Sequence, residues 1–295
     1  MIWQRLRQMW WKLIACMNPR HSPELRSKKK KRAGRFLFKM FGNLLNGAGS
    51  MFILSYRPDF DYDFGHFPDY GRFFEYWKAG HEETNLGDLF RLYLLVLNTQ
   101  LIIEDGIAGD FVELGVYKGN SAKILCELGR RANRKTVLFD TFGGFDKADI
   151  SSEGQTVHRT YGDTSLEAVR RFVGEEDVVY VPGRFPDSLS KIEKPIQIAL
   201  AHLDCDLYEP MKAGLEAFYD VMSPGGMFIL HDYASGWWKG AKRAVDEFLR
   251  DKPERLIAMP DKSGTAIFRK IGSLPRAATT LHPSHRSPTT EGPLT

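Results

Sequence analysis

The stretch that decides the fold is FVELGVYKGNSA, residues 111–122, where an apolar run meets two glycines and then a helix-forming segment. This order predicts a buried strand that turns tightly into a helix. In open α/β sheets, ligands bind at such a turn, outside the carboxyl ends of the strands. We expect Gly115 and Gly119 to let a ligand approach the backbone. The amides that open the helix should favour a negative group such as a carboxylate.

The turn and the next apolar run together suggest the kind of ligand. The two glycines follow a GxxxG spacing and not GxGxxG, which argues against a dinucleotide because its pyrophosphate needs the longer loop. Asp140 closes the run KTVLFD, residues 135–140, and an acid at this place can accept both hydroxyls of a ribose. The alternative is a structural turn in which Asp140 caps a loop.

Outward from this stretch, apolar strands alternate with amphipathic helices. We expect strands at 110–115, 135–140, 178–183, 195–204, 226–232, 255–260 and 264–270, and helices at 85–103, 119–132, 165–174, 208–222 and 241–251. This alternation predicts an α/β fold with a mostly parallel, doubly wound sheet. The connection DKSG, residues 261–264, is too short for a crossover, so the last strand should run antiparallel at or near an edge.

The rest of the chain divides by composition. We expect a basic amphipathic extension at 1–40, a helical and aromatic lid segment at 41–105, the α/β domain at 106–270 and a disordered tail at 271–295. Within the second segment, the aromatic stretch 55–77 shows no periodicity that predicts regular structure. It is expected to form a lid or substrate wall, or a satellite aromatic core.

Charge and cysteine content limit the compartment. Lys and Arg number 41 against 37 Asp and Glu, and the excess lies in residues 1–39, where Glu24 is the only acid. Residues 2–17 predict a basic amphipathic helix, which either lies on an anionic membrane surface or packs on the body or a second subunit. No apolar run approaches the roughly 20 residues of a transmembrane helix, and Lys12 interrupts any signal peptide. Three scattered cysteines favour a reducing cytosol, with membrane contact through residues 1–35 left open.

Acidic residues follow two expected strands. Asp204 and Asp206 come at the end of 195–204, and on a strand residues i and i+2 share a face. Two like charges facing the same way need a cation, a shared proton or water. His231 and Asp232 close the next strand, so all four groups should converge at one edge of the sheet. Such a set suits Mg²⁺ or Mn²⁺, whereas the alternative is a set of turn caps at the cleft rim. His202, two residues before Asp204, is expected to be a core histidine.

These residues lie in motifs that resemble a known family, the S-adenosylmethionine-dependent O-methyltransferases of the macrocin, mycinamicin and novobiocin group, which methylate sugar hydroxyls on antibiotics. The resemblance covers residues 84–270 and rests on GDLFRLYLLVLNTQ, GDFVELGVYKGNSAKIL, LFDTFGGF, VPGRFPDSL, HLDCDLYEPMKAGLEAFYDVMSPGGMFILHDY and KGAKRAVDEF. It implies a Rossmann-like class I methyltransferase sheet of seven strands with the last antiparallel. The domain 106–270 would then be the methyltransferase domain.

The resemblance also implies residue roles. The cofactor S-adenosylmethionine would lie against Glu113, Gly115, Tyr117, Gly119, Asp140, Thr141, Phe142 and Arg184. Asp204 and Asp232 would bind a divalent metal and Asp206 would act as the general base. This chain has His231 where the family more often has Asp. The imidazole could still bind metal, and it would shift preference from Mg²⁺ toward Mn²⁺, Fe²⁺ or Zn²⁺.

The expected function is metal-dependent O-methylation of a hydroxyl on a sugar or glycoside. The expected partners are a small saccharide substrate and no nucleic acid, with a homo-oligomer left open. One alternative is a nucleotide-sugar glycosyltransferase, for which DxD is also a metal signature. The other is a protein that binds the cofactor without turnover, in which His231 marks a degraded metal site.

Overall fold

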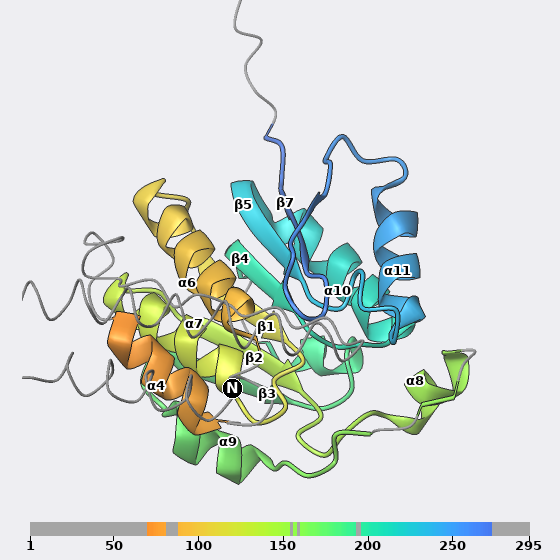
Figure 1. Cartoon of the computed structure of the whole chain (residues 1–295), viewed down its shortest axis with the longest axis horizontal. Coiled ribbons are helices and arrows are strands. Elements are labelled where there is room, and N and C mark those ends of the chain that lie inside the picture. The colour runs from red at the N-terminus through yellow and green to blue at the C-terminus, as the bar shows by residue number, and fades with distance from the viewer. Residues whose placement is uncertain (1–69, 81–87, 154–155, 158–159, 193–195, 273–295) are drawn as a thin grey trace, which may run out of the picture. The chain divides into compact units, whose positions relative to one another are not determined.

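The computed structural model describes residues 70–80, 88–153, 156–157, 160–192 and 196–272 (Figure 1). The chain divides into two units, and all described residues belong to Pro58–Thr295. The expected basic helix at 2–17 and the expected tail, apart from residues 271 and 272, lie outside the described residues. Membrane contact, the oligomer, the compartment and the domain boundaries therefore stay predictions.

A seven-stranded sheet organises the described chain in the order β3-β2-β1-β4-β5-β7-β6. Its strands are β1 (Asp110–Leu114), β2 (Thr136–Asp140), β3 (Val178–Pro182), β4 (Ile198–Leu203), β5 (Met222–Leu230), β6 (Ile257–Ala258) and β7 (Ala266–Arg269). The pairs from β3 to β5 are parallel, and β7 runs antiparallel to both β5 and β6. The predicted fold class is confirmed, with the antiparallel last strand one position in from the edge.

Helices cover both faces of this sheet (Figure 1). They are α4 (Tyr70–Gly80), α6 (Leu89–Glu104), α7 (Asn120–Arg131), α8 (Lys147–Ser152), α9 (Leu166–Val173), the short 3₁₀ helix η1 (Asp187–Lys191), α10 (Tyr208–Val221) and α11 (Lys239–Leu249). Helices α4, α6 and α7 share one hydrophobic cluster with Phe111 of β1. Helices α10 and α11 share another with Val112, the next residue along the same strand. Successive side chains of a strand point to opposite faces, so continuous apolar runs are needed to fill both cores.

Side-chain caps explain where three of these helices begin. Asp88 accepts a hydrogen bond from the amide of Arg91 at the start of α6, Asp146 caps α8 and Ser165 caps α9. Such caps satisfy amides that have no partner inside the helix. The residues that precede α10 and α11, Leu207 and Trp238, make no side-chain cap bond.

The structure corrects the prediction for the aromatic stretch 55–77. Its last part begins α4, in which Phe73 and Trp77 are 2% and 1% exposed. They are four residues apart and therefore share one helix face. Aromatic residues have only moderate helix propensity, so burial against α6 and α7 decides the conformation. The short helices α8 and η1 were also not predicted.

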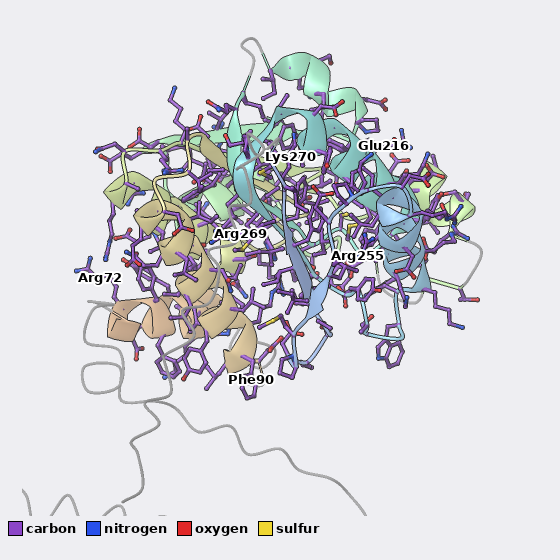
Figure 2. All side chains as sticks on the ribbon, turned by 90° about the horizontal axis from the view of Figure 1, so that it is seen from above. Arg72, Phe90, Glu216, Arg255, Arg269 and Lys270 are labelled. Carbon is purple, nitrogen blue, oxygen red and sulfur yellow. The ribbon has the colours of Figure 1, made fainter. Side chains whose placement is uncertain are left out.

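The outer surface carries polar side chains together with scattered apolar ones (Figure 2). Phe90, at the start of α6, is 42% exposed. Arg269, at the end of β7, forms an ion pair with Asp105 at 2.5 Å. Its neighbour Lys270 donates to the carbonyl of Met222. Within the described ranges, no helix has both the length and the apolar content needed to cross a membrane.

Candidate active site

A cavity of about 590 Å³ lies at the carboxyl ends of β1, β2, β4 and β5. This volume suits a small-molecule ligand. The predicted site residues that line it are Gly115, Tyr117, Asp140, Thr141, Asp204, Asp206, His231 and Asp232. Four other predicted site residues, Glu113, Gly119, Phe142 and Arg184, do not line it.

The glycine turn brings β1 close to β4. Gly115 has φ +88°, and a Cβ at this position would lie 2.0 Å from the carbonyl oxygen of Asp204. A Cβ on Gly119, at φ +87°, would lie 2.8 Å from Val173. The missing side chains thus make room for protein atoms, and the approach of a ligand to these glycines stays a prediction. Gly115 sets how closely Asp204 approaches the turn.

The negative group at the amides of this turn is Asp140 itself. Its carboxylate accepts hydrogen bonds from the amides of Val116 at 2.6 Å, Tyr117 at 2.9 Å and Phe142 at 2.6 Å. The alternative, in which Asp140 caps a loop, therefore describes the contacts in the structure. Asp140 also lines the cavity, and its role toward a ribose stays a prediction.

Glu113 lies in the core beneath the cavity. It is fully buried, and its Oε1 is 2.7 Å from Nδ1 of His202, which is 1% exposed. The two residues are partners in the β1–β4 register. His202 is a core histidine, as predicted. In this structure Glu113 supports the sheet under the site, and a direct cofactor contact stays a prediction.

The other predicted cofactor residues stand at the wall or just behind it. The Arg184 guanidinium bonds the Asp149 carboxylate at 2.6 Å, and Asp149 faces the cavity. Burial raises the pKa of Asp149, and the charge of Arg184 opposes that shift. Phe142 is buried, with its ring 6.3 Å from that of Tyr180. Arg184 and Phe142 therefore hold the wall in place and do not form its surface.

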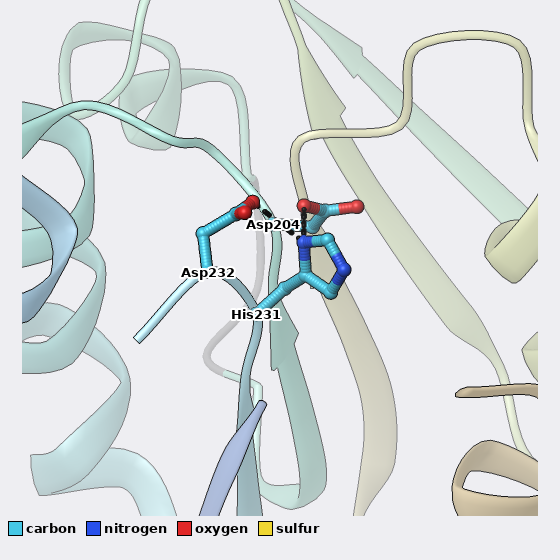
Figure 3. Close-up of side chains that lie close together, drawn as sticks. All are labelled: Asp204, His231 and Asp232. Atoms are coloured by element: carbon cyan, nitrogen blue, oxygen red, sulfur yellow. Dashed lines mark hydrogen bonds and ion pairs between the residues drawn. The ribbon is translucent and has the colours of Figure 1, made fainter. Parts of the chain in front are cut away.

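Asp204, His231 and Asp232 come together as the sequence predicts (Figure 3). Nδ1 of His231 is 2.7 Å from Asp204 Oδ1 and 2.6 Å from Asp232 Oδ2. Burial and Arg91 lower the pKa of His231, but the two carboxylates outweigh them and raise it to about 9. The pKa of Asp204 falls well below its usual value, because Arg91 and His231 outweigh its burial. An imidazolium between two carboxylates therefore holds this centre together at neutral pH.

Arg91 is a functional candidate that sequence reasoning missed. It projects from α6, and its guanidinium forms an ion pair with Asp204 and lies 5.9 Å from the ring centroid of Trp77. A signal was available, because Arg91 lies three and four residues before the buried Leu94 and Leu95. A basic residue on the buried face of a helix indicates an acidic partner in the interior.

Asp206 reaches the centre by a turn, which corrects the expectation that it shares a strand face with Asp204. Strand β4 ends at Leu203, and Asp206 has φ +60° in the left-handed region. Its carboxyl is hydrogen-bonded to that of Asp232. Burial, then the charges of Asp232 and Asp204, raise the pKa of Asp206 well above its usual value. The like charges are thus tolerated because the pKa of Asp206 is raised beside Asp232 and the Arg91 cation pairs with Asp204.

The same residues fit a divalent ion. One ligand atom each from Asp204, His231 and Asp232 lies within 4.8 Å of the others. Two carboxylates and an imidazole are a donor set typical of Mn²⁺ and related ions. The remaining ring nitrogen of His231, Nε2, is buried without a hydrogen-bond partner among the described residues. Because a metal takes only neutral imidazole, binding would require loss of the proton that now holds the centre together.

Comparisons with known proteins agree with this architecture. A family model described as macrocin-O-methyltransferase matches residues 84–268. The 8-demethyl-8-(2,3-dimethoxy-alpha-L-rhamnosyl)-tetracenomycin-C 4'-O-methyltransferase of Streptomyces olivaceus is 33% identical over 161 residues, which are 50% of this chain and 61% of that protein. The demethyldecarbamoylnovobiocin O-methyltransferase of Streptomyces niveus is 30% identical over 182 residues, or 55% of this chain and 67% of that protein.

A solved structure shows the same fold. The O-methyltransferase NovP aligns with a TM-score of 0.51 at 28% identity, covering 61% of this chain and 81% of NovP. The match to the tetracenomycin enzyme spans less than two thirds of that relative's length.

Proposed function

Because the chain belongs to the macrocin-O-methyltransferase family, we propose that it transfers the methyl group of S-adenosylmethionine to a hydroxyl of a sugar or glycoside. The observation that carries this proposal is the convergence of Asp204, Asp206 and Asp232 in the cavity that the glycine turn also lines. A methyl donor and an acceptor hydroxyl must meet in one cavity, and the chemistry needs a base where they meet.

The difficult part of the reaction concerns the acceptor. An unactivated alcohol is a poor nucleophile at neutral pH, whereas a sulfonium methyl group is already a good electrophile. The protein must therefore hold the oxygen in line with the methyl group and remove its proton. Positioning can lower such barriers by as much as ~7 kcal/mol, and general-base help typically adds ~10²- to 10⁴-fold.

We assign the base role to Asp206. Its carboxyl lies in the cavity wall, and burial together with the neighbouring carboxylates raises the pKa of Asp206 well above its usual value. A carboxylate with a raised pKa is a stronger base than an ordinary one. Asp206 can accept the acceptor's proton only when its carboxyl is ionised.

We assign metal binding to Asp204, His231 and Asp232. A divalent ion bound there, Mg²⁺ or Mn²⁺, would act as a Lewis acid and lower the pKa of an acceptor hydroxyl. The imidazole of His231 favours Mn²⁺ over Mg²⁺. Arg91 would hold the second oxygen of Asp204 and so keep the carboxylate in one orientation.

A saccharide acceptor is supported by the tetracenomycin relative, whose named substrate carries a rhamnosyl group. In this chain, Trp237 and Trp238 line the cavity after β5, and Trp237 is 78% exposed. An exposed indole beside the carboxylate centre offers a flat apolar face to the carbon side of a sugar ring. The cofactor would occupy the other half, beside Tyr117 and Asp140.

One observation favours a second candidate, a protein that binds the cofactor without turnover. The centre is already paired internally, because Arg91 forms an ion pair with Asp204 and His231 contacts both Asp204 and Asp232. Carboxylates that already have cationic partners have a weaker need for a metal ion. Among the described residues that line the cavity, no contact favours the glycosyltransferase alternative.

Calorimetric titration of S-adenosylhomocysteine into metal-stripped protein, repeated with Mg²⁺ and with Mn²⁺, tests the proposal. We expect micromolar binding and a separate heat of Mn²⁺ uptake. Cofactor binding without uptake of either ion would favour the second candidate. No cofactor binding in any condition would overturn the methyltransferase proposal.

A further inference from the structure

Glu153 is a buried carboxylate that the proposed chemistry does not use. It follows the last residue of α8, as the C-cap of that helix, and is 5% exposed. Its Oε2 accepts a hydrogen bond from the amide of Tyr208 at 2.9 Å, and its Oε1 accepts one from the amide of Gly240 at 3.0 Å. Tyr208 is the first residue of α10 and Gly240 the second of α11. One side chain therefore caps two helices that lie 55 and 87 residues further along the chain.

These two helices depend on Glu153 because their own preceding residues supply no cap. Leu207 and Trp238 make no side-chain cap bond. A carboxylate at a helix start satisfies free amides and interacts favourably with the helix dipole. Gly240 is shaped for this contact, because a Cβ there would lie 2.3 Å from Glu153 Oε1. The Glu153 carboxylate can reach the amide of Gly240 because residue 240 has no side chain.

Both caps lie at the starts of the helices that follow the carboxylate centre along the chain. Tyr208 follows Asp206 by two residues, and Gly240 lies in the first turn of α11, directly after the loop that begins with Asp232. Asp206 and Asp232 both have positive φ, at 60° and 59°, so their backbone conformations must be held by the surrounding structure. The hydrogen bonds of Glu153 hold the downstream end of each loop.

Helix α8, which precedes Glu153, is itself held by contacts with the rest of the fold. Asp146 and Asp149, at its start and within it, line the cavity on the cofactor side. Arg184 bonds Asp149 and thereby fixes α8 to the segment after β3. Helix α8 also packs against α10. The segment that forms part of the cofactor wall thus also reaches the loops that carry the proposed base and metal ligands.

We propose that Glu153 is a positioning residue that holds the loops after β4 and β5, and with them Asp206 and Asp232, in the geometry that binds metal. The inference rests on the proposed function. Glu153 touches no reacting group, and it acts through the amides of Tyr208 and Gly240. Its loss should loosen the metal site more than the cofactor site, because Gly115, Tyr117 and Asp140 are held independently by the glycine turn.

Two variants of the full chain test this role. Glu153→Gln keeps the shape but places an NH₂ group against one of the two amides. Gly240→Ala pushes the carboxylate away, yet alanine favours a helix more than glycine does, so weaker helix propensity cannot explain a loss. Mn²⁺ affinity is measured by electron paramagnetic resonance of the free ion, and S-adenosylhomocysteine affinity by calorimetry.

Glu254→Gln is the matched control. Glu254 is also buried, at 2% exposed, and its Oε1 accepts the amide of Ile271 and the hydroxyl of Tyr219, each at 2.9 Å. It contacts the opposite end of α10, away from the cavity. Thermal unfolding of all three variants shows whether they lose comparable stability.

We expect the Mn²⁺ dissociation constant to rise about tenfold in Glu153→Gln and in Gly240→Ala, with S-adenosylhomocysteine affinity within about threefold of wild type. The control should keep both affinities. Unchanged Mn²⁺ affinity in both test variants, or an equal loss in the control, would overturn the positioning role. So would a loss of cofactor affinity as large as that of Mn²⁺. A wild-type protein that binds neither ligand would instead overturn the proposed function, and this inference with it.

Discussion

The two ends of the cavity hold their carboxylates in opposite ways. At the glycine turn, Asp140 accepts three backbone amides, so its charge is balanced by main-chain groups of fixed geometry. At the ends of β4 and β5, the carboxyls of Asp206 and Asp232 are hydrogen-bonded to each other, and Asp204 is held between a guanidinium and an imidazole. Backbone amides hold the carboxylate at the glycine turn, whereas charged side chains hold those at the ends of β4 and β5.

This difference indicates which half performs the chemistry. Backbone hydrogen bonds shape a binding surface and change little with pH. A cluster of buried titratable groups keeps perturbed pKa values, which are typical of reactive centres. We therefore expect substitutions at the carboxylate end to change turnover and metal binding, and those at the glycine turn to change stability and cofactor affinity.

The largest effect is expected from Asp206→Asn, which tests whether the carboxylate end of the cavity performs the chemistry. The amide cannot accept the acceptor's proton, so turnover should fall about 10²- to 10⁴-fold. Cofactor affinity should stay near wild type, because Asp206 lies at the other end of the cavity. Methyl transfer to a saccharide acceptor and calorimetry with S-adenosylhomocysteine measure the two quantities. Asp220→Asn, an exposed acid on α10, is the control. Near-normal turnover in Asp206→Asn would remove the base role.

The second test concerns Gly115, where the glycine turn approaches the backbone of Asp204. Gly115→Ala places a methyl group against the carbonyl of Asp204 and strains a residue with positive φ. We expect the free energy of unfolding to fall by about 4 kcal/mol, measured in urea.

Two other glycines separate the causes of that loss. Gly106→Ala shares the positive φ but has open space, so it should cost only the backbone part. Gly143→Ala has neither constraint and should be close to neutral. If Gly115→Ala behaved like Gly106→Ala, close approach of Asp204 would not be the reason for the glycine.

The third test uses pH on the metal-free protein. The pKa of His231 is about 9 when folded, against 6.5 for an ordinary histidine. Its stabilising contribution is therefore complete below about pH 6.5 and is lost as pH rises through about 9. The difference corresponds to about 3 kcal/mol in the free energy of unfolding. Asp206 changes stability in the same direction, because its pKa is raised and its charged form is disfavoured in the fold.

Urea unfolding between pH 6 and 9.5 in a chelator measures this loss, and His231→Gln should flatten it. Added Mn²⁺ should stabilise the protein more as pH rises, because the metal binds only neutral imidazole. A wild-type profile as flat as that of His231→Gln would contradict the ion-paired state of the centre.

The smallest effect is expected from Asp140→Asn. The asparagine side chain has one acceptor oxygen where the aspartate has two, so one backbone amide loses its hydrogen bond. The free energy of unfolding should therefore fall by about 1 to 2 kcal/mol. If Asp140 also holds a ribose, the affinity for S-adenosylhomocysteine should fall about tenfold while that for Mn²⁺ stays unchanged. Lower stability with unchanged cofactor affinity would leave Asp140 with the capping role alone.

The hydrophobic periodicity of the sequence, together with the residues that end each apolar run, determined most of the fold. Apolar runs ending in Gly115, Asp140, Asp204 and Asp232 place those residues at the carboxyl edge of a parallel sheet. This follows because the strand period and the crossover rule are local properties of the chain. The short link 261–264 likewise determined the antiparallel last strand. The convergence of Asp204, His231 and Asp232 could be predicted for the same reason.

Only the tertiary structure decided how these groups are balanced. The pairing of Arg91 with Asp204 and of Glu113 with His202 joins residues about a hundred positions apart, and no local pattern encodes such distances. The left-handed turn at Asp206 and the double cap by Glu153 also depend on neighbouring elements. Hydrogen bonds and charges act through space, so the environment of each carboxylate is a property of the packed fold. The position of each carboxylate at a strand end, in contrast, follows from the sequence.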